Sequence, residues 1–408
     1  MSISLWMTKR LRFAVALFAA VAIAACGGDD TGAGPVDQGR AAQDASGSGT
    51  RDTPGGGAQA DDGASLDEAV ADGSAVLLER ATVFDTDPLG IGGPALTILV
   101  PQGWTVQGGP VWRHEYSNLA TYEGTVSSAD GFQGVQFFPI FPQIWQDGGI
   151  PFFPEGSNYL GNDVRAPITD AGVFLETLIL PSYRAQFGPR IIAREPLPDV
   201  AALYVANSLP GSTAVAERLL TEHTANGVTM HEEFTIVLTF TLNPGIPGAV
   251  IWSPQQIFST RAPAAEFEEA RPVLQAIATS PVADLDWFAG YAYVLDLSVR
   301  NGLEAIRAAG EASRIISQAN AEISDIIIDT YNQTQASNDR IHEAWSQTIR
   351  GVETYAAPFE GGGTYELPNG YNYVYGFEDG KVILTNEPGF DPVQAFPGEV
   401  FELLDVKR

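Results

Sequence analysis

The chain contains a single cysteine, Cys26, among its 408 residues. Without a second thiol there can be no disulfide within the chain and no cysteine cage for a metal. Histidine is also scarce, and the four histidines have no pair at the spacing of metal ligands: His114, His223, His231 and His342. We therefore expect a fold held by its hydrophobic core, with no metal and no cofactor.

Basic residues are few as well. The 22 lysines and arginines face 50 aspartates and glutamates, which leaves a formal net charge of -28. A surface this acidic repels the phosphate backbone, so we expect no binding to nucleic acid. Because the acidic residues are spread along the chain, they favour solubility over storage of cations.

Long hydrophobic runs are missing too, since no stretch approaches the ~20 apolar residues of a transmembrane helix. The longest uncharged apolar run covers residues 13–25 and follows Lys9, Arg10 and Arg12. A short basic segment before a short apolar one is typical of a secretory signal peptide. We predict that residues 1–25 form such a signal.

The run ends in Ile23-Ala24-Ala25-Cys26-Gly27. This segment resembles the lipobox of bacterial lipoproteins. The resemblance implies that Cys26 carries a diacylglycerol, becomes the mature N-terminus and anchors the protein to a membrane of the cell envelope. Gly27, in place of an aspartate, favours the outer membrane or cell surface over the inner membrane. The alternative is ordinary cleavage after Ala25, with Cys26 incidental.

Composition and periodicity divide the mature chain into four parts. Residues 26–73 are rich in Gly, Ala, Asp and Ser and predict a lipidated disordered tether. Residues 74–280 mix strand and helix patterns and predict an α+β domain with an antiparallel sheet and packed helices. Residues 281–350 predict a long amphipathic helical segment, and residues 351–408 a small C-terminal β-hairpin module.

Several local predictions can be compared with the structure. We expect strands at residues 95–100, 201–206 and 228–242, and a turn at 108–110 followed by a strand at 111–116. Helices are expected at 169–186, capped by Asp170 and interrupted near Pro181, and at 212–223. The long helical segment should break near Gly310 or Asn332. It then either folds back as a hairpin on the sheet or protrudes as a coiled-coil stalk.

Two stretches resemble known families. Leu99-Val-Pro-Gln-Gly-Trp104 is similar to the opening of PsbP-like domains, which implies an antiparallel sheet with helices on its faces and a binding or assembly role. The C-terminal motifs resemble a group of uncharacterised secreted bacterial proteins: Asn338-Asp-Arg340, Trp345, Ile349-Arg-Gly351 and Glu366-Leu-Pro-Asn-Gly-Tyr371. That group implies no particular activity.

Aromatic residues gather in loops and in one C-terminal strand, where they are either plugs of the core or a binding surface. The candidate binding residues are Trp104, Trp112, Trp145, Phe152, Phe153, Trp345, Arg350, Tyr371, Tyr373 and Tyr375. We predict a non-enzymatic envelope protein that binds an envelope protein or a glycan through them.

Two other functions stay open at this stage. A hydrolase of envelope or extracellular esters or glycans would place a histidine beside a carboxylate, and His231 with Glu233 or His342 with Asp339 are the pairs to inspect. A purely structural protein would use the long helix to form oligomers. The sequence leaves the oligomeric state open, and no catalytic residue can be named from it.

Overall fold

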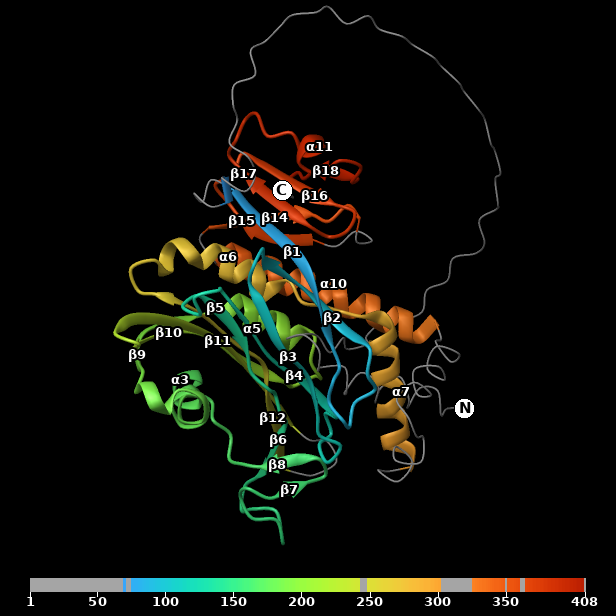
Figure 1. Ribbon diagram of the computed structural model, residues 1–408. Coiled ribbons are helices and arrows are strands. Elements are labelled where there is room, and N and C mark those ends of the chain that lie inside the picture. Colours follow the sequence, from blue (N-terminus) through green and yellow to red (C-terminus); the bar gives the residue numbers. More distant parts are fainter. Residues whose placement is uncertain are drawn as a thin grey trace, which may run out of the picture.

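The computed structural model describes residues 69–70, 75–242, 248–301, 325–348, 351–359 and 364–406. Cys26 and the predicted signal and tether, up to residue 68, lie outside the described residues. The described chain is a mixed α+β structure dominated by antiparallel sheets, as predicted (Figure 1). None of its described helices is long and apolar enough to cross a membrane.

The smaller sheet combines both ends of the described chain. Its strands, in spatial order, are β13 (Val282–Ala283), β2 (Pro94–Pro101), β1 (Ala75–Phe84), β17 (Val382–Thr385), β16 (Tyr373–Phe377) and β18 (Phe401–Leu403). The predicted C-terminal hairpin is present as β16 and β17. It does not form a sheet of its own, because β17 pairs with β1, with Ala75 opposite Thr385.

The larger sheet has ten strands. Its main path runs β3 (Thr105–Trp112), β4 (Ala120–Ser127), β5 (Gly134–Phe137), β12 (Ala249–Pro263), β11 (Val228–Leu242), β10 (Thr213–Ala225) and β9 (Arg190–Pro196). Three short strands extend it at one end: β6 (Gln143–Gln146), β7 (Asn158–Tyr159) and β8 (Asn162–Val164). A separate pair consists of β14 (Val352–Ala356) and β15 (Thr364–Pro368).

Helices cover both faces of the larger sheet. The segment 171–187 comprises α3 (Ala171–Phe174), a π-helix (Leu175–Ile179), α4 (Leu180–Tyr183) and a 3₁₀ turn (Ala185–Phe187). It packs on Phe234, Ile236 and Leu238 of β11. Val237 points to the other face, in the core that contains α5 (Pro198–Ala206), α6 (Phe267–Thr279) and α7 (Leu285–Asn301). The strand predicted at 228–242 is therefore present and is buried on both faces over most of its length.

The predicted turn at residues 108–110 is wrong, because these residues lie inside β3 and pair with β4. Gly108 has a φ of 99°, and a Cβ there would lie 2.2 Å from the backbone oxygen of Glu123. The absence of a side chain at Gly108 thus allows β3 and β4 to lie close together. Of the strand predicted at 111–116, only Val111 and Trp112 are in a strand, because β3 ends at Trp112.

Two neighbouring segments have the opposite secondary structure to the one predicted: 201–206 was predicted as a strand and 212–223 as a helix. Residues 201–206 belong to helix α5, which starts with Pro198 in its first turn, a favoured position for proline. Residues 212–223, predicted as helical, belong to β10, which pairs with β9 on one side and β11 on the other. β10 and β11 form a hairpin closed by Asn226-Gly227, both with positive φ, and the two ladders override a weak local preference for helix. The helix predicted at 169–186 is present, and Asp170 caps it by accepting from the Val173 amide at 2.9 Å. The interruption expected near Pro181 is wrong, because Pro181 lies in the first turn of α4, directly after the π-helix.

The predicted helical segment contains α7 and α10 (Asp325–Thr348), while residues 302–324, including Gly310, lie outside the described residues. The break expected near Asn332 is wrong, because α10 continues through it. Helix α10 packs against α5, α7, β14 and β15. The described part of α10 therefore packs on the rest of the protein and does not protrude from it. This agrees with the alternative in which the helical segment folds back on the sheet.

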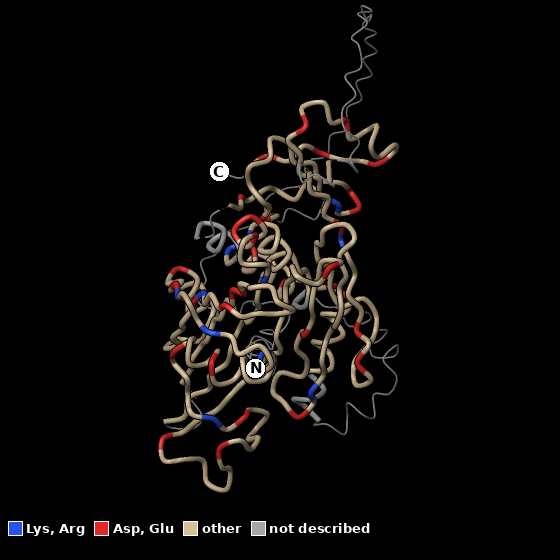
Figure 2. The backbone as a smooth tube through the Cα atoms, turned by 60° about the vertical axis from the view of Figure 1, so that its left-hand side comes forward, with Lys and Arg blue, Asp and Glu red and all other residues tan. Residues whose placement is uncertain are grey.

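Charge is distributed over the whole molecule. Figure 2 shows aspartate and glutamate along the tube from one end to the other, with basic residues among them. The described part has no single acidic block, which agrees with the pattern of the sequence.

Candidate functional site

The candidate aromatic residues fall into three places. Trp145, Phe152 and Phe153 meet at the end of the larger sheet, beside β7 and β8, which we call the tip (Figure 1). Trp104 and Trp112 belong to the core, and Tyr371, Tyr373 and Tyr375 lie with the C-terminal strands at the opposite end. Arg350 and the side chain of Trp345 lie outside the described residues.

The tip is held by backbone pairing. β6 pairs with β12, with Trp145 opposite Val250, and it runs parallel to β8, with Ile144 opposite Val164. Ile144, Ile150 and Val164 form a small buried core beneath the loop. The aromatic and proline-rich loop therefore rests on a rigid end of the sheet.

Residues 150–153 form a tight turn, in which the Phe153 amide donates to the Ile150 carbonyl at 3.0 Å. Phe152 has a φ of 67° and is 99% exposed. Proline followed by a residue of positive φ is the pattern of a type II turn, where glycine is the usual second central residue. Phenylalanine here pays about 1–2 kcal/mol of backbone strain while its ring gains no burial. Strain of this kind is concentrated at functional sites.

These residues enclose an open pocket of about 390 Å³. Its lining is mostly apolar and consists of Trp145, Gly149, Ile150, Phe152, Phe153, Pro154, Glu155 and Val164. Glu155 is the one charged residue among them. The Phe153 ring also packs on Tyr159, with centroids 4.7 Å apart. The volume lies at the lower end of small-molecule sites, which span roughly 300–1,000 Å³.

Sequence reasoning found the three rings of this pocket and missed Ile150, Glu155 and Val164. Glu155 directly follows Phe152-Phe153-Pro154, and this position could have identified it as a charged residue of the aromatic loop. No sequence pattern identifies Val164 as a pocket residue, because it reaches the pocket only through the parallel pairing of β8 with β6.

Trp112 is fully buried and cannot contact a ligand at the surface. Its Nε1 donates to Oδ2 of Asp85 at 3.0 Å, and Nε1 of Trp287 donates to the same oxygen at 2.9 Å. The half-buried Trp104 packs against the same core. Both tryptophans thus act as plugs of the core, the alternative stated for the aromatic loops.

The three tyrosines of the C-terminal strands are partly buried. The ring of Tyr375 packs against Phe390 and Phe401, with centroids 5.7 and 6.0 Å apart. Burial raises the pKa of Tyr371 and Tyr375 above the ordinary tyrosine range, so both hydroxyls stay protonated at neutral pH. None of the three tyrosines lines the tip pocket or the polar cavity between α6 and α10.

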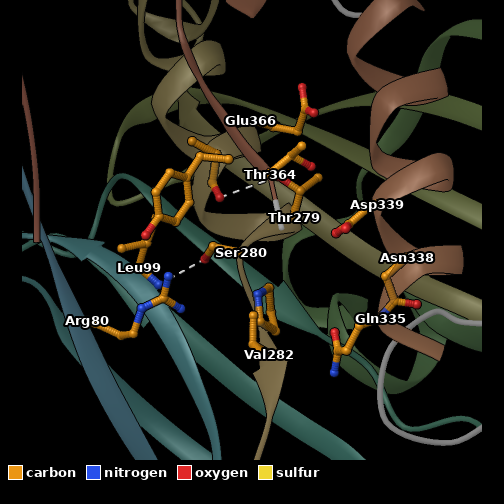
Figure 3. Close-up of a pocket in the computed structure, with 13 residues that line it drawn as sticks. Arg80, Leu99, Thr279, Ser280, Val282, Gln335, Asn338, Asp339, Thr364 and Glu366 are labelled. Carbon is orange, nitrogen blue, oxygen red and sulfur yellow. Dashed lines mark hydrogen bonds between the residues drawn. The ribbon is translucent and has the colours of Figure 1, made fainter. Parts of the chain in front are cut away.

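A second, polar cavity lies between α6, α10 and the strands β1 and β15 (Figure 3). Gln335, Asn338 and Asp339 of α10 face it, with Arg80 across the cavity. Its volume is about 30 Å³, above the roughly 10–15 Å³ that a single water needs. The buried Oδ1 of Asn338 has no hydrogen-bond partner among the described residues. This cavity suits a buried water at a packing seam and is too small for an organic ligand.

The described histidines stand apart from such pockets. His114 Nε2 lies 3.1 Å from the Leu89 carbonyl, and His231 lies 3.6 Å from the Glu222 carboxylate. His231 is not paired with Glu233, whose carboxylate instead contacts Arg218 and Arg271. Burial lowers the pKa of His223, which stacks on Phe187. The side chain of His342 lies outside the described residues.

Within the described ranges, no group of three histidine, cysteine or acidic residues could hold a metal ion. The fold and its pockets thus define a class: an α+β protein with an open aromatic pocket at the end of its larger sheet.

Comparison with known proteins adds little to this class. No family model matches the chain, and no curated protein matches it. Among solved structures, the chain is similar to LpqN, described as involved in cell envelope biogenesis of Mycobacterium tuberculosis. The identity is 14% and the TM-score 0.21, over 54% of this chain and 98% of LpqN. A TM-score this low carries no argument about function.

Proposed function

We propose that this protein is a lipid-anchored protein of the cell envelope that binds a ligand or partner without catalysis, through the pocket at its tip. The observation that carries the proposal is the pocket itself, formed by Trp145, Phe152 and Phe153 on a rigid sheet end. A fully exposed ring held in a strained turn gains nothing for folding, so a contact with another molecule is its natural use.

The position of the tip supports this role. The chain enters the described sheet at Ala75, which pairs with Thr385 among the C-terminal strands. The pocket lies at the opposite end of the molecule (Figure 1). An anchor on Cys26 would therefore join the body at the end remote from the pocket, leaving the tip accessible to molecules of the envelope.

Within the described part, the histidine contacts give no support to the hydrolase alternative. None of the described histidines lines either pocket, and the pair inspected first, His231 with Glu233, is not formed. A binding role is the function that the pocket supports best.

The test is capture from envelope extract with the lipid-free protein starting at residue 27. The tip variant combines Trp145→Ala, Phe152→Ala and Phe153→Ala. A control removes three exposed apolar side chains elsewhere: Phe84, Leu89 and Val400, which are 53%, 56% and 54% exposed. We expect mass spectrometry to find a component that wild type and control retain and the tip variant loses. Equal capture by all three proteins, or no capture, would contradict the proposal.

The anchor is tested separately by Cys26→Ser. Loss of the acylated thiol should move the protein from the membrane fraction to the soluble fraction, because a lipid supplies the only anchor we infer. The measurement is fractionation followed by intact-mass analysis of the N-terminus. A Cys26→Ser protein that stays in the membrane fraction, or a wild-type N-terminus without lipid, would rule out this anchor.

A further inference from the structure

The chemistry of the tip pocket points to a particular class of ligand. This inference rests on the proposed binding function and goes further, to the charge of what is bound. We propose that the pocket takes a small organic ammonium ion of the choline type, with its methyl groups against the rings of Trp145, Phe152 and Phe153 and its charge near Glu155.

The first argument is the composition of the lining. It offers three aromatic rings and one carboxylate, and none of its residues is basic. Aromatic faces carry partial negative charge, so they attract cations, and quaternary ammonium ions are recognised by cages of such rings. A carboxylate beside the rings adds a full negative charge.

The second argument concerns the competing classes of ligand. An anion would meet Glu155 and a protein of net charge -28, and both oppose its binding. A sugar presents many hydroxyls that need hydrogen-bond partners, whereas Glu155 is the only acidic or amide side chain in the lining. A cation covered with methyl groups needs few hydrogen bonds and suits this lining.

The third argument concerns the source of the cation. The lining contains the carboxylate of Glu155 and no basic residue. The phosphate of a phosphocholine lipid headgroup would be repelled there. The geometry therefore favours a free ammonium compound over a zwitterionic lipid surface.

The test compares choline with 3,3-dimethyl-1-butanol, in which a neutral carbon replaces the charged nitrogen at the same shape. Calorimetric titration of the lipid-free protein should give choline an affinity at least about five-fold above the neutral compound, as cation–π attraction and one exposed charge pair provide. Glu155→Gln should reduce this difference to the part that the aromatic rings supply, and leave the affinity for the neutral compound unchanged.

Asp147→Asn is the matched control, because it removes an acidic residue of the same loop that is not in the lining. It should leave the preference for choline intact. Phe152→Gly should weaken choline binding several-fold; since this side chain is 99% exposed, the variant tests the ring without endangering the fold. Circular dichroism of each variant checks that the fold is retained.

Equal affinity for choline and the neutral compound would overturn the inference and leave an apolar ligand site, so the binding function would survive. Failure of choline to bind would also overturn it, while the capture experiment would still decide the broader proposal. Vesicles of phosphatidylcholine form a third arm. If they bind and free choline does not, the ligand is a lipid surface and the inference falls.

Discussion

Asp85 shows how one residue can join distant parts of the chain. Its buried carboxylate accepts hydrogen bonds from the indoles of Trp112 and Trp287 and from the amide of Ile91 at 3.1 Å. These donors come from β3, from α7 and from the loop after β1. A Cβ on residue 90 would lie 2.2 Å from Oδ1 of Asp85. Any side chain larger than that of Gly90 would therefore collide with the Asp85 carboxylate.

Asp85→Ala should lower the free energy of unfolding by about 3–5 kcal/mol, because two buried indole N–H groups and one amide lose their acceptor at about 1–3 kcal/mol each, offset in part by relaxation. Urea denaturation followed by tryptophan fluorescence measures this loss. Asp87→Ala is a useful comparison, because Asp87 accepts from the Trp112 backbone and not from the buried indoles. Equal losses in the two variants would contradict the role assigned to Asp85.

Phe152 supplies a second prediction for a single residue. Phe152→Gly relieves the strain of a positive φ but adds freedom to the unfolded chain, so we expect the free energy of unfolding to change by less than about 1 kcal/mol. Thermal denaturation checks this. A loss of several kcal/mol would show that the ring serves folding, against its proposed role in binding.

At the scale of a strand, β11 places two adjacent buried glutamates on opposite faces of the larger sheet. Glu232 accepts from Arg184 at 2.6 and 2.8 Å and from Ser259 at 2.6 Å. Burial by itself raises the pKa of Glu232, but these bonds and the charges of Arg184 and Arg261 outweigh it and hold the pKa below the ordinary value. For Glu233, burial outweighs the charges of Arg218 and Arg271, and its pKa is raised.

The two residues should therefore respond to pH in opposite ways. A lowered pKa stabilises the fold above the ordinary carboxyl pKa of about 4.3, and this stability is lost as the pH falls through the folded pKa. Glu232→Gln should cost about 3–5 kcal/mol at pH 7, because it leaves the charge of Arg184 buried without its partner, and the difference from wild type should shrink below about pH 4.

Glu233→Gln is the matched variant. A raised pKa means that Glu233 favours the fold when protonated, and this contribution is lost as the pH rises through the folded pKa. Its arginines also keep other partners, Glu195 for Arg218 and Glu268 for Arg271. The loss at pH 7 should thus be smaller than for Glu232→Gln. Urea denaturation at pH 7, 5 and 3.5 tests the pair, and equal losses at pH 7 would refute the assignment.

At the scale of the whole molecule, β1 is the strand that closes the structure. It lies between β2 and β17, so residues near both ends of the described chain share one sheet. The buried Leu78 of β1 and Leu99 of β2 pack with C-terminal residues, among them Tyr355, Leu367 and Leu384. The C-terminal strands therefore share a buried cluster with β1 and β2.

Deleting residues 351–408 should abolish cooperative folding, because it removes the partner strand of β1 and exposes a buried cluster. The fragments 69–350 and 69–408 can be compared by solubility and by urea denaturation. A soluble 69–350 fragment with a cooperative transition would contradict this prediction and favour the separate C-terminal module expected from the sequence.

The local signals of the sequence predicted much of the fold. Strands at 95–100 and 228–242, the cap at Asp170 and the C-terminal hairpin follow from alternation, turn residues and capping, which act over a few neighbours. The exchange of types at 201–206 and 212–223 had a different cause. β10 is a strand because β9 and β11 flank it. The Asn226-Gly227 turn was a local signal for the pairing with β11, whereas the pairing with β9 joins segments separated by helix α5 and has no local signal.

By itself the sequence determined the acidic charge, the lone cysteine with its lipobox resemblance and the α+β class, because each depends on composition or on short-range order. It also singled out the aromatic residues. Only the tertiary structure decided which of them line a surface pocket: pairing with β12 and β8 brings Trp145 to the tip pocket, whereas Asp85 holds Trp112 in the core. Burial is set by contacts between residues far apart in the chain, and these exist only once the sheets have formed.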